Sequence, residues 1–159
     1  MKPVVVVDAS VAVKWFLPPS PDEPDAKLAL DLLQAYRDDL IELLEPPVWQ
    51  AEVAAVLARL VPDSAEGLVW RLLSFDHTPA SGVRVYLKAT QLAISLRHHL
   101  FDTIYHAASL MHPSAILITA DEKYRLKAET FGKVLPLARW KEIFDTIPEH
   151  ENPGEAGRP

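Results

Sequence analysis

Four acidic residues that lie far apart in the sequence could meet at one site: Asp8, Glu52, Asp102 and Asp121. The first follows an apolar run at residues 4–7 and the last follows a similar run at 115–119. Both runs are typical of strands in a parallel sheet, whose ligands bind outside the carboxyl ends of the strands. The other two acids stand near the beginnings of expected helices that can reach the same edge. We therefore expect the four carboxylates to converge on one pocket.

Carboxylates that lie close together repel one another unless protons or a cation neutralise them. A hard divalent ion with oxygen ligands, Mg²⁺ or Mn²⁺, suits such a cluster and can bridge it to substrate phosphates. One or two ions of this kind activate water for in-line attack on a phosphodiester and stabilise the leaving oxygen. The pattern therefore predicts metal-dependent phosphodiester hydrolysis. The three aspartates are expected to contact the metal, directly or through water, and Glu52 to bind the metal or orient the attacking water.

Each of these residues also has a purely structural explanation. The three aspartates could cap the helices that follow them. Glu52 is harder to explain in this way, because its apolar neighbours indicate a partly buried setting in which an unpaired carboxylate is costly. Ser10 and Thr119 stand beside acids at the same edge and could hold water at the metal, or make only the ordinary bonds of caps and turns. The joint pattern, and no single acid, indicates a site.

Alternating strands and helices are needed to position these residues. Apolar runs predict four strands, at residues 4–7, 40–44, 115–119 and 134–135. Helical periodicity, prolines and capping residues predict helices at residues 10–16, 26–39, 48–60, 63–74, 85–97, 101–112, 122–131 and 140–144. This alternation favours an α/β fold with a parallel sheet.

The size and composition of the chain fit one domain. It has 159 residues, 49% of them hydrophobic, which allows a sizeable core. We expect the domain to span residues 1–148, and residues 149–159 to form a disordered acidic tail because they contain no core-forming residue. The absence of cysteine excludes disulfides, zinc–cysteine sites and thiol nucleophiles, and the five glycines form no nucleotide-binding glycine motif. No signal peptide or apolar run of membrane length is present, so we expect a cytoplasmic protein without membrane association.

The segments that carry the four acids resemble the motifs of PIN domains, and more narrowly those of VapC-type toxin ribonucleases. The segments are VVDASVAVKWF (6–16), PPVWQAEVAAVL (46–57), FDTIYHAASL (101–110) and LITADEKY (117–124). Each contains one of the four acids, and the resemblance runs from about residue 3 to residue 145. The first and third segments are the more specific ones.

This resemblance implies a three-layer α/β/α PIN-like fold with a central, mainly parallel sheet of four to five strands. It also implies an Mg²⁺- or Mn²⁺-dependent endoribonuclease that cleaves single-stranded or structured RNA. Such toxins form homodimers and are neutralised by a cognate antitoxin, which often inserts an arginine among the carboxylates. The alternative is a non-catalytic PIN-like regulatory or binding module whose acids only cap helices. A haloacid-dehalogenase-type phosphatase is disfavoured, because Ser10 stands where that chemistry needs an aspartate.

Three residues depart from the family pattern. Ala55 stands where the family often has asparagine, which removes an expected polar contact near the site. Phe101 replaces a frequent tyrosine, and His106 occupies a position that is usually apolar. A proline-rich segment at residues 18–24 is longer than expected.

Three basic residues close in sequence to the first and last acids are candidate RNA contacts: Lys14, Lys123 and Arg125. They would supply local positive charge, or else lie on solvated helix faces. The histidine pair at residues 98 and 99 shows no metal-binding spacing and is expected at the surface or in a loop. The tryptophans, at residues 15, 49, 70 and 140, could stack on bases but stand in apolar helical contexts, which favours packing in the core or a subunit interface.

The formal net charge of −6 excludes a broadly basic nucleic-acid surface. The four acids and a tail of net charge −2 account for this whole value. The rest of the chain is formally neutral, so the acidity does not argue against an RNA substrate.

Overall fold

The structure is a computed structural model that describes residues 1–21 and 25–146. The tail expected at residues 149–159 and the expected domain end at residue 148 lie outside the described residues. Within the described ranges, one hydrophobic core joins residues from nearly all strands and helices.

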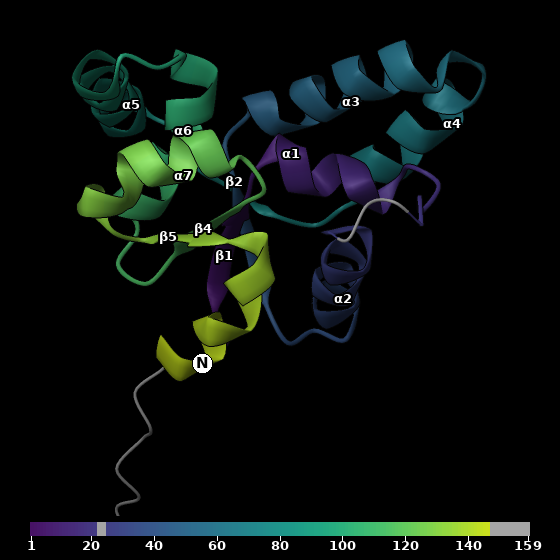
Figure 1. The fold of residues 1–159 in the computed structure, drawn as a ribbon, viewed down its shortest axis with the longest axis horizontal. Helices are drawn as coiled ribbons and strands as arrows, with labels where there is room; N and C mark the ends of the chain where they lie inside the picture. The colour runs from purple at the N-terminus through teal and green to yellow at the C-terminus, as the bar shows by residue number, and fades with distance from the viewer. Residues whose placement is uncertain (22–24, 147–159) are drawn as a thin grey trace, which may run out of the picture.

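A five-stranded, wholly parallel sheet forms the centre of the molecule, with the strand order β3-β2-β1-β4-β5 (Figure 1). The strands are β1 (Val4–Val7), β2 (Glu42–Glu45), β3 (Thr78–Pro79), β4 (Ile116–Thr119) and β5 (Val134–Pro136). Strand β1 lies in the middle, where its valines are covered on both faces, as the uninterrupted β-branched run predicts. Its register places Val5 beside Leu43 of β2 and Ile116 of β4.

Helices flank the sheet and complete three layers. They are α1 (Ala9–Ala12), α2 (Asp25–Arg37), α3 (Val48–Leu60), α4 (Pro62–Leu73), α5 (Val83–Leu96), α6 (Leu100–Met111) and α7 (Glu122–Ala128). Helix α6 packs on β1, β2 and β4 and is covered by α5, while the 3₁₀ segment η3 (Leu137–Thr146) packs on β4 and β5 and meets α2. Two further 3₁₀ turns, η1 (Val13–Trp15) and η2 (Glu129–Phe131), extend α1 and α7. The expected α/β fold with a mainly parallel sheet is confirmed.

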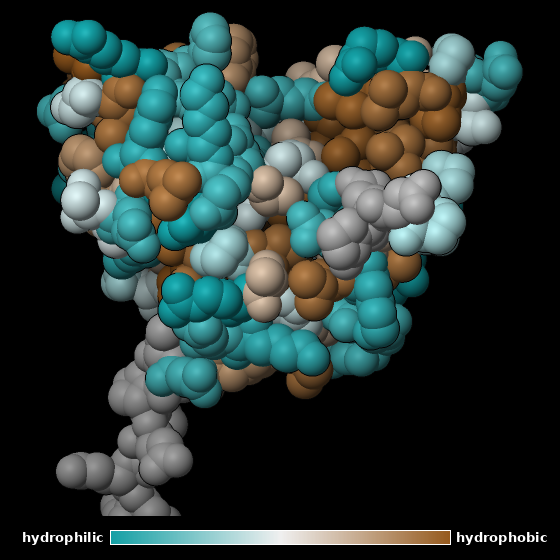
Figure 2. Space-filling view, in the orientation of Figure 1, coloured by the Kyte–Doolittle hydropathy of each residue, from teal (hydrophilic) through white to brown (hydrophobic). Residues whose placement is uncertain are grey.

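Helices α3 and α4 pack against each other and extend away from the sheet as an arm (Figure 1). Pro62 begins α4, as expected for a residue whose missing N–H needs no partner in the first helical turn. Figure 2 shows apolar surface gathered over this α3–α4 arm, whose exposed apolar side chains are Leu60, Trp70 and Leu73.

Three of the four tryptophans lie in the core, as the apolar context predicts: Trp15, Trp49 and Trp140. Phe75 stacks on Trp15 with ring centroids 5.5 Å apart and meets Trp49 edge-on at 6.2 Å. Trp70 does not lie in the core, because it is 71% exposed on α4. Core packing is therefore the wrong explanation for Trp70, and a place in a subunit interface stays a prediction.

None of the helices among residues 1–21 and 25–146 is long and apolar enough to cross a bilayer.

Candidate metal centre

Asp8 lies directly after β1, and two hydroxyl groups hold its carboxylate. Its backbone N–H donates to the carbonyl of Ile118 at 3.1 Å, which extends the pairing of β1 with β4 by one residue. Its Oδ2 atom accepts hydrogen bonds from Ser10 Oγ at 2.9 Å and from Thr119 Oγ1 at 2.7 Å. The side chain makes no capping bond to α1, so helix capping does not explain this aspartate. Ser10 and Thr119 instead orient Asp8 at the edge of the sheet.

Asp121 lies at the carboxyl end of β4 and does cap a helix. Its Oδ1 atom accepts the backbone N–H of Tyr124 at 2.9 Å, which confirms the capping explanation for this residue. The capping bond engages only Oδ1, and Oδ2 does not take part in the cap. The backbone N–H of Asp121 donates to Thr119 Oγ1 at 3.0 Å, so Thr119 links this acid to Asp8. Capping and a place in the site are therefore compatible.

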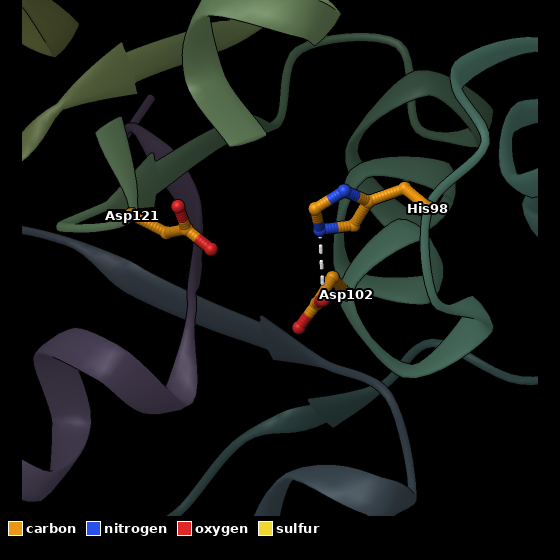
Figure 3. A group of neighbouring side chains, drawn as sticks. All are labelled: His98, Asp102 and Asp121. Atoms are coloured by element: carbon orange, nitrogen blue, oxygen red, sulfur yellow. Dashed lines mark ion pairs between the residues drawn. The ribbon is translucent and has the colours of Figure 1, made fainter. Parts of the chain in front are cut away.

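Asp102 lies in the first turn of α6, where it pairs with a histidine from the preceding loop. The His98 Nε2 atom is 2.9 Å from Asp102 Oδ2, and the His98 side chain is only 10% exposed. His98, Asp102 and Asp121 point toward one another from separate segments, with ligand atoms all within 4.8 Å (Figure 3). Oxygen and imidazole donors at this spacing can hold one divalent cation.

His98 lies in a loop, one of the two settings expected from the sequence. Its side chain faces the carboxylates, which the sequence did not indicate. The cause is Arg97, which ends α5 in the left-handed conformation with φ of 48° and turns the chain back toward the site. Its neighbour His99 is exposed. It occupies the N-cap position of α6, but its side chain makes no capping hydrogen bond.

Glu52 projects from the first turns of α3, and a tyrosine of α6 holds it. The Tyr105 hydroxyl donates a hydrogen bond to Glu52 Oε2. Burial raises the pKa of Glu52, the bond from Tyr105 lowers it, and the negative charges of Asp8 and Asp102 raise it further. Glu52 therefore lies within the electrostatic reach of two other acids, although it does not belong to the group of three close ligand atoms.

Glu45 is a fifth acid in this region, which the sequence did not indicate. It is the last residue of β2, and it is fully buried. Its Oε1 atom accepts the backbone N–H of Val7 at 2.7 Å, and its Oε2 atom has no hydrogen-bond partner among the described residues. Burial raises its pKa well above the ordinary value, and the charge of Asp8 adds to this effect. The metal-free protein therefore favours the protonated form of Glu45 more than an ordinary glutamate does.

The electrostatics of the site favour a cation. Burial also raises the pKa of Asp8, against the lowering effect of the Thr119 and Ser10 hydroxyls, while Asp102 raises it. Three carboxyl groups thus have raised pKa values in the absence of metal: Asp8, Glu45 and Glu52. A divalent ion at this edge would stabilise their charged forms.

We expect Glu45→Gln to stabilise the metal-free protein at alkaline pH. Because the folded state keeps a proton on Glu45 that the unfolded state loses above its ordinary pKa, the free energy of unfolding falls as pH rises through this window. Glutamine keeps the bond from Val7 without a charge. The gain should grow by about 1.4 kcal/mol for each pH unit between the ordinary pKa of a glutamate and the raised pKa of Glu45, and it should shrink toward pH 5.

Thermal unfolding in EDTA at several pH values measures this effect. Glu66→Gln on the exposed surface of α4 is the matched control and should show no such trend. A difference between Glu45→Gln and wild type that is constant from pH 5 to pH 8 contradicts the assignment.

His106 supports the site from the core. It is fully buried, and its Nε2 atom lies 2.7 Å from the carbonyl of Gly132, so Nε2 carries the proton. Nδ1 then accepts the Tyr124 hydroxyl at 3.0 Å, and burial lowers the histidine pKa. The Tyr124 ring also packs on His98, with centroids 4.9 Å apart. A histidine at this usually apolar position thus anchors a residue that contacts two members of the site.

The other residues singled out from the sequence lie in different settings. The Arg125 guanidinium is engaged by Glu122 and Glu129 on α7. Lys123 is exposed on the same helix, and Lys14 is partly buried in η1. Ala55 and Phe101 are both exposed. Contact of Lys14, Lys123 and Arg125 with RNA stays a prediction.

The arrangement of strands, helices and carboxylates defines a three-layer α/β/α protein of the PIN-like fold, with an acidic centre at the carboxyl edge of its sheet. The structure is similar to the crystal structure of FitAcB from Neisseria gonorrhoeae, with a TM-score of 0.60 and 18% sequence identity. The similarity covers 84% of this chain and 98% of that chain. No protein-family model matches the sequence, and no curated protein matches it. The likeness confirms the fold expected from the resemblance.

Proposed function

We propose that the protein is a metal-dependent endoribonuclease and the toxin of a VapC-type toxin–antitoxin pair. The observation that carries this proposal is the meeting of acids from four separate segments at the carboxyl edge of a PIN-like sheet. The resemblance of the four segments to PIN motifs points in the same direction. Phosphodiester hydrolysis is the chemistry that such a cluster suits best.

The donor set fits Mg²⁺ or Mn²⁺. Asp102 and Asp121 present carboxylates beside the His98 imidazole, and Asp8 is held at the same edge by two hydroxyls. The orphaned, buried Oε2 of Glu45 shows an excess of acidic groups over protein partners here. When bound, the ion would act as a Lewis acid toward the phosphodiester and help to activate water.

The residues around the cluster have separate tasks in this proposal. Ser10 and Thr119 fix the orientation of Asp8. Tyr105 fixes Glu52, whose raised pKa suits it to accept a proton from the attacking water and to release it afterwards. Asp121 stays in place through its cap on α7. The site would therefore be preorganised before RNA arrives.

Cleavage of a labelled single-stranded RNA oligonucleotide by the purified chain tests this function. We expect fragments with Mn²⁺ or Mg²⁺ and none with EDTA, because the carboxylates alone cannot stabilise the charge that develops at the phosphate. A DNA oligonucleotide of the same sequence is the matched control and should stay intact. Cleavage that persists in EDTA, or none with either ion, contradicts the proposal.

The proposal includes partners. Apolar side chains exposed on the α3–α4 arm and on α5 offer surface for a second copy or an antitoxin: Leu60, Trp70, Leu73, Val83, Leu87 and Ile94. An antitoxin arginine among the carboxylates would substitute for the positive charge of the metal. We propose a homodimer that meets both RNA and antitoxin in the cytoplasm.

Two bonds in the site favour the alternative of a non-catalytic PIN-like module. Asp121 caps α7, and Asp102 pairs with His98, so both acids have protein partners without a metal. Metal binding separates the two functions: a nuclease must bind Mn²⁺ through the cluster, and a module whose acids are structural need not.

A further inference from the structure

We propose that a basic pocket beside the metal centre binds a backbone phosphate of single-stranded RNA, next to the phosphate that is cleaved. This inference rests on the proposed function and adds a substrate subsite to it. The pocket has a volume of about 360 Å³ and lies where the end of α5 meets α7. Its lining residues are Ala93, Arg97, His98, His99, Lys123 and Lys127.

The charge of the lining indicates an anionic ligand. Arg97, Lys123 and Lys127 contribute three cations, two imidazoles stand among them, and no carboxylate lines the pocket. Across residues 1–21 and 25–146, none of these three cations forms an ion pair with a carboxylate, whereas the nearby Arg125 is held by two glutamates. Lys127 Nζ lies 3.5 Å from His98 Nδ1, so Lys127 contacts an imidazole and not a carboxylate.

Position connects the pocket to the proposed chemistry. His98 lines the pocket and also pairs with Asp102 through Nε2, so one imidazole separates the basic hollow from the acidic cluster. A phosphodiester at the cluster would place an adjacent phosphate of the same strand within reach of the three cations. Arginine and lysine donors are the groups that bind phosphate oxygens most strongly.

The charge of the cluster explains why such a pocket is needed. The chain outside the four acids and residues 149–159 is formally neutral, so the acidic cluster itself is what repels a polyanion where the RNA must bind. Cations concentrated at the border of the cluster offset this repulsion locally. A nucleic-acid strand can place one phosphate at the cluster and a second phosphate in the pocket, whereas a small phosphate ester has only one. The pocket therefore favours an extended nucleic-acid strand.

Neutralising the pocket tests the inference. The variant Arg97→Asn/Lys123→Gln/Lys127→Gln should bind a fluorescent single-stranded RNA about 10-fold more weakly than wild type. The slope of log affinity against log salt should become shallower by roughly 0.7 for each phosphate that the protein no longer neutralises. In cleavage, KM should rise with little change in kcat, because these residues contribute binding and not chemistry. Asparagine is chosen at position 97 because it tolerates the left-handed backbone.

The matched control is Arg37→Gln/Arg59→Gln/Lys141→Gln, which removes three exposed positive charges elsewhere. Loss of affinity in the pocket variant beyond that of the control supports the subsite. Equal affinity of the two variants overturns it, even if wild type cleaves RNA normally. The subsite is also overturned if the wild-type protein binds no RNA. In that case the metal-dependent cleavage assay tests the proposed function separately. If the triple variant unfolds, the double variant Lys123→Gln/Lys127→Gln should lose affinity and salt dependence in the same direction.

Discussion

Replacing Asp8 by asparagine is expected to abolish metal-dependent RNA cleavage, with a loss of at least about 100-fold. Substitutions that only disturb the support of a metal ligand already cost 10- to 100-fold, and this one removes a charge from the centre itself. The fold should survive, because the asparagine carbonyl can accept the same two hydroxyl bonds from Ser10 and Thr119. Burial raises the pKa of Asp8, so a neutral side chain should not destabilise the metal-free protein.

Initial cleavage rates with Mn²⁺ and thermal unfolding in EDTA measure these two effects together. Asp121→Asn should lose activity similarly while its helix cap is kept, since asparagine caps as well as aspartate does. Asp25→Asn in the first turn of α2 is the matched control. Activity near the wild-type level in Asp8→Asn, with folding intact, would contradict the assignment of Asp8.

The second large effect concerns the choice of metal. We expect the protein to bind Mn²⁺ at least about 10-fold more tightly than Mg²⁺, because an imidazole beside two carboxylates suits a transition metal better than it suits Mg²⁺. Removing the imidazole by His98→Ala should weaken Mn²⁺ binding strongly and Mg²⁺ binding little. The preference for Mn²⁺ should therefore largely disappear.

Calorimetric titration with each ion measures both affinities. His99→Ala is a close control, since it removes the neighbouring imidazole, which is exposed and stands outside the group of ligand atoms. Equal selectivity in His98→Ala and wild type would exclude His98 as a ligand. No binding of Mn²⁺ to wild type at millimolar concentration would favour the non-catalytic module.

The sequence predicted those parts of the fold that local pattern determines. The apolar runs indicated β1 and β4, and with them the places of Asp8 and Asp121 at one edge of the sheet. Strand β3 was not predicted, because it has two exposed residues, one of them a proline, and is formed only by pairing with β2. Its edge position suits a residue that cannot donate a backbone hydrogen bond.

Glu45 and His98 owe their places near the site to tertiary structure, which the sequence pattern did not predict. Glu45 is buried because the backbone N–H of Val7, 38 residues away, needs an acceptor there. The expected strand ended one residue earlier, so nothing marked Glu45 as internal. His98 faces the cluster because Arg97 turns the chain in the left-handed conformation, which arginine seldom adopts. Neither cause leaves a periodic pattern in the sequence.

The central place of β1 has a consequence for the newly made chain. One edge of β1 pairs with β2, about 40 residues further along, but its other edge must wait for β4, about 110 residues further along. Ribosomes add roughly 5–20 residues per second, so this second edge stays open for several seconds of synthesis. Thr119, which orients Asp8, arrives with β4, and Asp121 follows it. The proposed nuclease site would therefore stay incomplete on the ribosome until β4 and Asp121 have been made.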